Sequence, residues 1–127
     1  MKDAEYMIRT MCVAYGQPVR QTAELPKETE RTLRKLLLME EFDEYLDAEK
    51  NDDIVEIADA LADMCVIILG TAAAYGIPLA AVFEEVHRSN MAKVMPDGTV
   101  KRRGDGKILK PDGWTPPDIA AVLRARG

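Results

Sequence analysis

Carboxylates are concentrated in the middle of this 127-residue chain. Eleven of its 22 acidic residues lie between positions 40 and 63, together with a single lysine. Glu41 and Glu44 are three residues apart, as are Glu56 and Asp59, so each pair shares one face of a helix. Carboxylates from two neighbouring helices suit a hard divalent cation such as Mg²⁺ or Mn²⁺, because these ions prefer oxygen ligands and leave coordination positions for substrate phosphates.

An acidic run on a helix is usually a solvated face, but the acids of the segment 28–49 continue an apolar stripe. At about 100° per residue, that stripe and the acids in line with it are Leu33, Leu36, Leu37, Glu40 and Glu44, with Glu41 on the shoulder. Asp43 and Asp47 point elsewhere and are expected on the surface. Unpaired charges beside buried packing would cost several kcal/mol each, so a compensating cation is expected.

The segment 53–75 repeats the pattern and is apolar on two sides. One side is predicted to form a buried stripe of Ile54, Ile57, Ala58, Leu61, Cys65 and Ile68. The other side aligns three acids with apolar residues, namely Glu56, Asp59 and Asp63 with Val66, Ile67, Gly70 and Ala74. A helix that is apolar on both sides is central in a bundle.

Helix start and stop signals divide the chain into elements. Gly16 and Gly76 are expected just past helix ends, and Pro78 near the first turn of the next helix. The predicted helices cover about 3–15, 28–49, 53–75, 78–90 and 120–126. Three Asp-Gly turn signals between 96 and 113 predict a basic turn-rich segment or small hairpin.

The expected fold is therefore all-α, a bundle of four main helices plus a short C-terminal helix. Residues 1–127 are expected to form a single domain with a flexible basic tail at about 94–114. Leu38, Phe42 and Tyr45 lie opposite the acids of their helix, and a chain of this length has little else to cover them. We therefore expect a homodimer, possibly a tetramer, that completes the bundle.

Composition and charge exclude several classes of protein. Hydrophobic residues make up 47% and the net charge is −5, as in soluble globular proteins. The acidic centre and the basic stretch 93–110 do not make the broad basic face that duplex DNA requires. The apolar stretch 64–77 is too short to span a bilayer, and the polar opening residues predict no signal peptide. With two cysteines expected to be reduced core residues, we predict a cytoplasmic protein without a membrane partner.

Several motifs resemble the MazG-like all-α nucleoside triphosphate pyrophosphohydrolases, a superfamily that includes dimeric dUTPases and phosphoribosyl-ATP pyrophosphohydrolase. The acids 40–44 and 56–59 look like its EExxE…ExxD signature, and Asp63 extends it. The loop 16–19, Arg34 and the stretch from Val86 through Asn90 to Lys93 are also similar. The tail from Gly106 to Asp118 resembles a phage and bacterial subgroup.

The resemblance implies Mg²⁺-dependent hydrolysis of a (d)NTP to the monophosphate and diphosphate, in nucleotide-pool house-cleaning, with Mn²⁺ as a possible substitute. The implied metal ligands are Glu41, Glu44, Glu56 and Asp59, with Glu40 as a further ligand or the base that orients water. Asp63 is a candidate either to support these ligands or to bind a further metal ion. Glu40, Glu41 and Glu44 are the catalytic candidates. The substrate-binding candidates are Asn90, Lys93, Gln17, Arg103 and Lys107.

Two alternatives stay open. One is the phosphoribosyl-ATP reaction of histidine biosynthesis, which uses the same metal chemistry. The other is a non-catalytic acidic protein, either a nucleotide sensor or a mimic of DNA. A mimic needs exposed acids, whereas several acids here share apolar faces. Base and sugar preference, the number of metal ions and the identity of the general base are not determined by the sequence.

Overall fold

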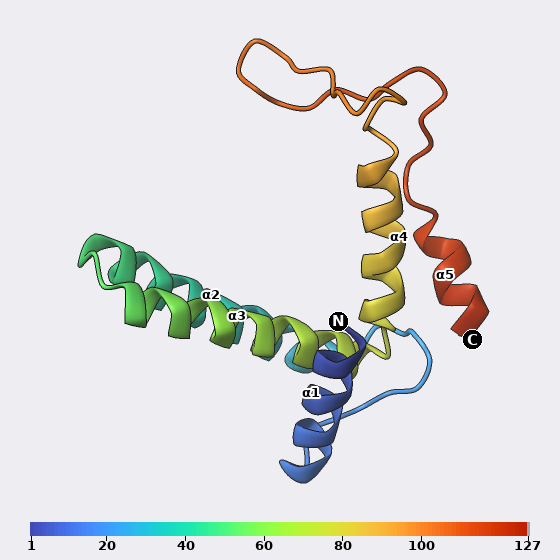
Figure 1. Ribbon diagram of the computed structural model, residues 1–127. Coiled ribbons are helices and arrows are strands. Elements are labelled where there is room, and N and C mark those ends of the chain that lie inside the picture. Colours follow the sequence, from blue (N-terminus) through green and yellow to red (C-terminus); the bar gives the residue numbers. More distant parts are fainter. Residues whose placement is uncertain (127) are drawn as a thin grey trace. The chain divides into compact units, whose positions relative to one another are not determined.

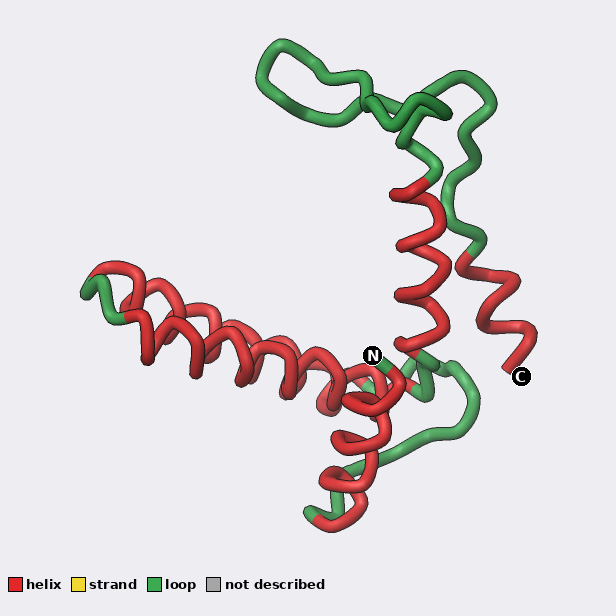
Figure 2. The backbone as a smooth tube through the Cα atoms, in the orientation of Figure 1, coloured by secondary structure: helices red, strands yellow, loops and turns green. Residues whose placement is uncertain are grey.

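The computed structural model describes residues 1–126 and divides the chain into two compact units, Met1–Leu79 and Ala80–Gly127. The helices are α1 (Lys2–Ala14), α2 (Glu28–Lys50), α3 (Ile54–Tyr75), α4 (Leu79–Met91) and α5 (Ile119–Arg126). Figure 2 shows only helices and loops over the described residues. The prediction of an all-α fold with four main helices and a short C-terminal helix is confirmed.

Local signals set the ends of α3. The Asp53 carboxylate accepts hydrogen bonds from the backbone N–H groups of Val55 and Glu56, both at 3.1 Å, and so caps the N-terminus. Gly76 ends the helix in the left-handed conformation at φ 71°. A Cβ at Gly76 would also collide with the carbonyl oxygen of Thr22, because the loop after α1 returns to this helix end. Gly76 is therefore required both by its dihedral angle and by the close approach.

Within the first unit, α2 and α3 lie side by side along their length (Figure 1). The residues of α2 that are buried or half-buried are Glu30, Arg31, Arg34, Leu37, Leu38, Glu41, Tyr45 and Ala48. The predicted inner face of α2 is therefore rotated from the observed inner face by about one residue, or roughly 100° around the helix axis. Leu33 and Leu36 are 53% and 51% exposed, and Glu40 and Glu44 are exposed as well, whereas the shoulder residue Glu41 is half-buried.

The physical reason for this rotation lies in Arg34. Its Nε donates to Thr71 Oγ1 and its Nη2 to the Ile67 carbonyl, both at 3.0 Å, so the guanidinium lies over α3. Gly70 makes room for it, since a Cβ there would lie 2.6 Å from Arg34 Nη2. A long polar side chain thus occupies the position that hydrophobic patterning assigned to leucine.

Of the two faces of α3 that were predicted to be apolar, mainly the second is covered within the first unit. The line that contains Asp63, Ile67, Gly70 and Ala74 is half-buried or buried. The predicted buried stripe is wrong for the single chain, because Ile54, Leu61 and Ile68 are 75%, 49% and 42% exposed. Both cysteines were predicted to be reduced core residues. Both are free, but only Cys12 is buried; Cys65 is exposed, so its predicted place in the core is wrong for the single chain.

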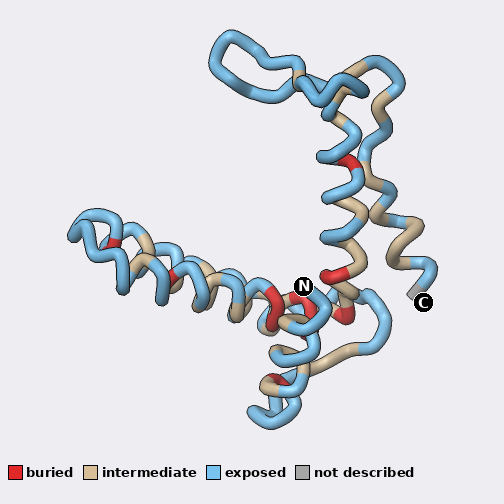
Figure 3. The backbone as a smooth tube through the Cα atoms, viewed as in Figure 1, coloured by how far each residue is buried: buried red, intermediate tan, exposed pale blue. Residues whose placement is uncertain are grey.

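Burial is concentrated toward the C-terminal half of α3 (Figure 3), where α1 also packs. The buried residues there are Leu69, Gly70, Ala72, Ala73 and Ala74. Among the described residues, α3 alone is long and apolar enough to cross a membrane, with a mean hydropathy of 1.8 over 18 residues. The apolar stretch 64–77, predicted to be too short to span a bilayer, is thus part of a longer apolar helix. In this fold α3 is a core helix that packs against α2 and α1.

In the second unit, the basic segment between α4 and α5 turns back on itself, and its described residues form no β-strand. The Arg103 N–H donates to the Lys107 carbonyl at 2.7 Å and the Leu109 N–H to the Lys101 carbonyl at 2.8 Å. One isolated antiparallel bridge joins Arg102 and Ile108. The sequence predicted either a turn-rich segment or a small hairpin here. The observed structure is a loop whose backbone pairs as in a hairpin.

Candidate metal centre

Three carboxylates converge between α2 and α3. Glu41 and Glu44 lie one turn apart on α2, and Asp63 lies on the facing side of α3. One oxygen from each lies within 4.8 Å of the others. The i,i+3 spacing on α2 and the pairing of the two helices therefore assemble an oxygen-rich cluster from positions distant in sequence.

The electrostatics of the cluster are unfavourable for carboxylates alone. Burial raises the pKa of Glu41, and the nearby Glu44, Asp63 and Glu40 carboxylates raise it further. Burial also raises the pKa of Asp63, with additional contributions from Asp59 and Glu44. Across residues 1–126, none of these acids forms an ion pair with a lysine or arginine. The negative charge is uncompensated by the protein.

The surroundings of the Glu41 carboxylate indicate whether a cation would fit in this cluster. Its Oε2 is buried and has no hydrogen-bond partner within the described chain. A buried acceptor without a donor is unfavourable by about 1–3 kcal/mol, and more when it is charged. A bound cation would satisfy that oxygen and offset the repulsion among the three carboxylates. An all-oxygen donor set suits Mg²⁺ or Mn²⁺, so the residues present fit such an ion.

The other predicted metal ligands lie around this cluster. Glu56 is exposed and lines a cavity of about 210 Å³ at the α2–α3 connection, together with Glu44, Asp47, Ala48, Asn51 and Asp53. Asp59 is exposed and lies close enough to Asp63 to raise its pKa. Glu40 acts in the same way on Glu41. The structure thus brings Glu41, Glu44 and Asp63 together, with Glu44 shared between the cluster and the cavity.

Asp47 is a cavity residue that sequence reasoning assigned to the ordinary surface. It is exposed, but it lines the same cavity as Glu44 and Glu56. A signal was present, because Asp47 follows Glu44 at the same three-residue spacing that links Glu41 to Glu44. The prediction that Asp47 lies on the surface is confirmed, and its place beside Glu44 in the cavity wall was not predicted.

Two predicted substrate-binding residues, Asn90 and Lys93, contact each other in the second unit. Lys93 Nζ donates to Asn90 Oδ1 at 3.1 Å. The same ammonium lies 5.5 Å from the centroid of the Trp114 ring, and Lys110 Nζ lies 4.8 Å from it. The Trp114 indole N–H donates to the Ser89 carbonyl at 2.6 Å, so the ring is fixed against α4.

The remaining predicted substrate-binding residues are Arg103 and Lys107 in the second unit and Gln17 in the first. Arg103 forms an exposed ion pair with Asp105 at 2.6 Å, and Lys107 is an exposed neighbour on the same turn. Gln17, in the first unit, is exposed, and its backbone N–H donates to the Cys12 carbonyl at 2.9 Å. It lines a small cavity of about 50 Å³ with Arg34 and Gly70, among other residues.

An all-α chain with a carboxylate cluster between two paired helices is the architecture of the MazG-like pyrophosphohydrolases. The sequence model of the phosphoribosyl-ATP pyrophosphohydrolase family matches residues 9–90. The chain therefore belongs to that family, whose members are hydrolases of phosphoric anhydrides in nucleotide-type substrates and are typically Mg²⁺-dependent. No curated protein matches the chain significantly. Residues 1–8 and 91–127 lie outside the match.

Proposed function

We propose that this protein is a Mg²⁺-dependent nucleoside triphosphate pyrophosphohydrolase that converts a (d)NTP and water into a (d)NMP and diphosphate. The single observation that carries the proposal is the buried, unpartnered Oε2 of Glu41 in a cluster with Glu44 and Asp63. Membership of the family adds support for hydrolysis of a phosphoric anhydride. We further infer that the enzyme is cytoplasmic and removes unwanted nucleotides from the pool.

In this proposal, Glu41, Glu44 and Asp63 hold Mg²⁺, with Glu56 and Asp59 as further ligands. When bound, the ion neutralises phosphate charge and makes a coordinated water more acidic. Glu41 supplies a buried, desolvated oxygen, which interacts strongly with a cation because little water competes for it. Glu44 joins the cluster to the cavity at the α2–α3 connection, where the cavity leaves space for substrate oxygens.

Glu40 is our candidate for the residue that orients the attacking water and accepts its proton. It is exposed and one residue from Glu41, so its carboxylate is accessible to solvent while close enough to influence the Glu41 pKa. A base must lie within hydrogen-bond reach of the proton that it accepts. Glu41 and Glu44 are the other candidates, and substitution distinguishes ligand from base by whether Mg²⁺ binding survives.

We further propose that Asn90 and Lys93 bind substrate phosphates, with Arg103, Lys107 and Gln17 as additional contacts. Trp114 makes the role of Lys93 measurable, because it is the only tryptophan in the chain and its ring lies 5.5 Å from Lys93 Nζ. Nucleotide that engages Lys93 should change the Trp114 emission. Lys93→Gln should abolish that change, and an unchanged response in this variant would remove Lys93 from the substrate site.

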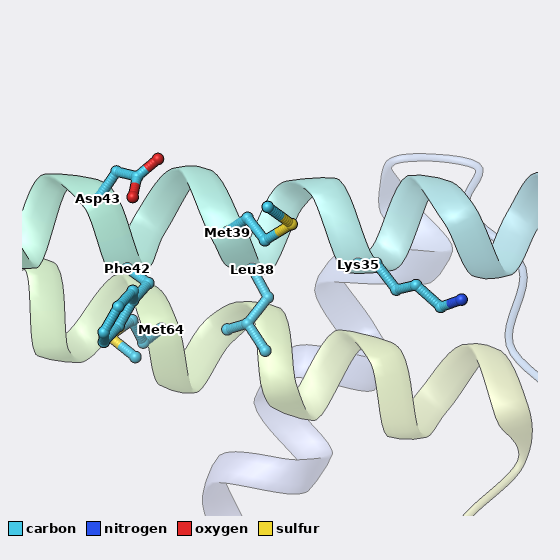
Figure 4. A pocket seen from close by; sticks show the side chains of 6 residues that line it. All are labelled: Lys35, Leu38, Met39, Phe42, Asp43 and Met64. Atoms are coloured by element: carbon cyan, nitrogen blue, oxygen red, sulfur yellow. The ribbon is translucent and has the colours of Figure 1, made fainter.

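We propose that the functional form is a homodimer, possibly paired into a tetramer. An apolar groove of about 530 Å³ runs along the α2–α3 pair, lined by Lys35, Leu38, Met39, Phe42, Asp43 and Met64. In Figure 4, Leu38 and Phe42 point toward α3, where Met64 lies beside the Phe42 ring. Exposed Leu61 and Ile68 add apolar surface on α3. Light scattering should give at least twice the 14.1 kDa chain mass.

A second candidate is hydrolysis of phosphoribosyl-ATP, which the matched family supports by name. It uses the same carboxylates and differs in the remainder of the substrate. A panel of dNTPs, NTPs and phosphoribosyl-ATP therefore separates the two candidates in one experiment.

The test is product analysis with Mg²⁺, separating diphosphate from orthophosphate. Diphosphate plus monophosphate is expected from at least one substrate, with loss in Glu44→Gln. Glu49→Gln is the matched control, because Glu49 is an exposed glutamate of the same helix outside both the cluster and the cavity. Absence of turnover on the whole panel by folded protein, or orthophosphate as the product, would overturn the proposal.

A further inference from the structure

The ring of Trp114, in the second unit, brings two lysines together. The ammonium group of Lys93 lies 5.5 Å from the ring centroid, and that of Lys110 lies 4.8 Å from it. Lys93 follows the end of α4, whereas Lys110 comes after the basic turn. Because a cation is attracted to the face of an aromatic ring, one side chain gathers two positive charges that are distant in the sequence.

The position of Trp114 is set by the C-terminal end of α4. A helix leaves its last four carbonyl groups without partners inside the helix. Three of these in α4 accept backbone N–H groups of the residues that follow, namely the carbonyls of Arg88, Asn90 and Met91. The fourth, the Ser89 carbonyl, accepts the Trp114 indole N–H at 2.6 Å. Ser89 is only 2% exposed, so the indole is attached to a buried point of the helix.

The charges of the two lysines are not neutralised by carboxylates. Within the described part of the chain, neither Lys93 nor Lys110 forms an ion pair. Arg103 of the same unit does so, because it contacts Asp105 at 2.6 Å. Lys93 Nζ instead donates to the neutral side chain of Asn90. Both ammonium groups therefore keep their charge for an anionic ligand.

The ring leaves each ammonium group able to bind such a ligand. An ammonium has three N–H donors, so a lysine beside an aromatic face still has donors for an anion. Lysine binds phosphate as a point charge on a flexible stem, and holding that stem in advance reduces the entropy lost on binding. A polyphosphate carries several negative charges along its length, which suits two separate ammonium groups.

We propose that Lys110 is a further phosphate-binding residue and that Trp114 is the positioning residue that holds Lys93 and Lys110 as a pair for a polyphosphate chain. The inference rests on the proposed function, in which Lys93 contacts substrate phosphates. It goes beyond that function because Lys110 and Trp114 lie outside the matched residues 9–90. The polyphosphate has two possible sources, the triphosphate of the substrate and the diphosphate that hydrolysis releases.

The first test is calorimetric titration of inorganic tripolyphosphate into the full chain in metal-free buffer. The parent should bind it, and Lys110→Gln should bind it about tenfold more weakly. Lys110 is exposed, so its variant preserves the fold. Lys101→Gln is the matched control and should bind as the parent does, because Lys101 is an exposed lysine of the same basic segment outside the contacts of the Trp114 ring.

A double-mutant cycle tests the positioning role of Trp114. Trp114→Leu removes both the ring and the bond to Ser89, so it should weaken tripolyphosphate binding by at least about tenfold. If the ring acts by holding Lys110, adding Lys110→Gln to Trp114→Leu should weaken binding by no more than about a further threefold. A purely structural contribution of Trp114 would leave the effect of Lys110→Gln undiminished at about tenfold.

The emission of Trp114 gives a measurement that needs no variant of the ring. Because both ammonium groups border the indole, saturating tripolyphosphate should change the emission of the parent. Comparison of two ligands then identifies the source of the chain. Tighter binding of tripolyphosphate than of diphosphate indicates the substrate, and equal or tighter binding of diphosphate indicates the released product.

Four results would overturn the proposal. They are binding of neither polyphosphate by the parent, unchanged binding in Lys110→Gln, an undiminished effect of Lys110→Gln in the Trp114→Leu background, and unchanged Trp114 emission at saturation. These titrations involve neither metal ion nor turnover. Absence of hydrolysis would therefore contradict the proposed function while leaving the polyphosphate site testable, so the two failures are distinguishable.

Discussion

Glu41 and Asp63 of the first unit and three carboxylates of the second unit have opposite environments. In the second unit, Glu85 accepts hydrogen bonds from Arg88 and from the Asp118 N–H, and these contacts lower its pKa. Asp97 and Asp105 also have lowered pKa values, through hydrogen bonds from Thr99 and Arg103 respectively. In the first unit, burial and neighbouring acids raise the pKa of Glu41 and of Asp63.

This difference separates carboxylates that the chain satisfies from carboxylates that it leaves unsatisfied. Glu85 joins α4 to the start of α5 and is complete without a ligand. Glu41 keeps a buried oxygen without a donor, which folding alone does not favour. A structure tolerates such a group where something else binds it, so the comparison points to the metal centre independently of the family match.

The largest effect that would sharpen the comparison is on catalysis. Glu41→Gln and Glu44→Gln should each reduce kcat/KM by about 100-fold or more, because each removes a charged ligand from the cluster. Glu85→Gln should leave kcat/KM within about twofold, since its contacts lie within the second unit. Steady-state kinetics with saturating Mg²⁺ measures both. An equal loss of kcat/KM in Glu85→Gln and in the two cluster variants would contradict the distinction between satisfied and unsatisfied carboxylates.

A smaller effect concerns the pH dependence of stability without divalent metal. Because the folded pKa values of Glu41 and Asp63 are raised, their stabilising contribution is fully present below the ordinary carboxyl pKa of about 4 and is lost as the pH rises through the raised values. Glu85, Asp97 and Asp105 behave oppositely, and their contribution is lost as the pH falls through the lowered values.

Glu41→Gln should therefore stabilise the metal-free protein at pH 7 and have little effect below pH 4, since the glutamine imitates the protonated acid. Denaturant unfolding in EDTA at the two pH values checks this. Destabilisation by the glutamine at pH 7 would show that the Glu41 carboxylate is already satisfied within the folded protein.

The smallest effect is expected where charges are paired but exposed. Asp105 and Arg103 form an ion pair whose side chains are 58% and 57% exposed. Asp105→Asn should change the free energy of unfolding by less than about 1 kcal/mol, because solvent screens such pairs. Denaturant unfolding measures this, and a larger loss would mean that the basic turn contributes more to folding than its exposure indicates.

Local sequence signals predicted the elements well. Gly16, Gly76 and Asp53 set helix boundaries by backbone dihedral angle and capping, which depend on few neighbours. The carboxylates that converge, Glu41, Glu44 and Asp63, were all among the predicted metal-site residues. Three-residue spacing indicated Glu41 and Glu44, whereas Asp63 was implied by the resemblance to the MazG-like family.

Helix orientation was less predictable, since it depends on the neighbouring surfaces. Patterning placed Leu33 and Leu36 inside and did not place Arg34 there. The observed rotation depends on the space above Gly70 and on acceptors at Ile67 and Thr71, which only the assembled pair reveals. The same rotation explains why Glu41 was assigned to a shoulder. Helices with two apolar faces do not specify which face meets which partner.

Calorimetric titration of Mg²⁺ into the metal-free protein tests the central claim most directly, namely that the Glu41, Glu44 and Asp63 carboxylates await a cation. The parent chain and Glu85→Gln should bind Mg²⁺ with the same affinity, and Glu41→Gln should bind it at least about tenfold more weakly. Equal affinity in Glu41→Gln and the parent, or no Mg²⁺ binding by the folded parent, would contradict the claim.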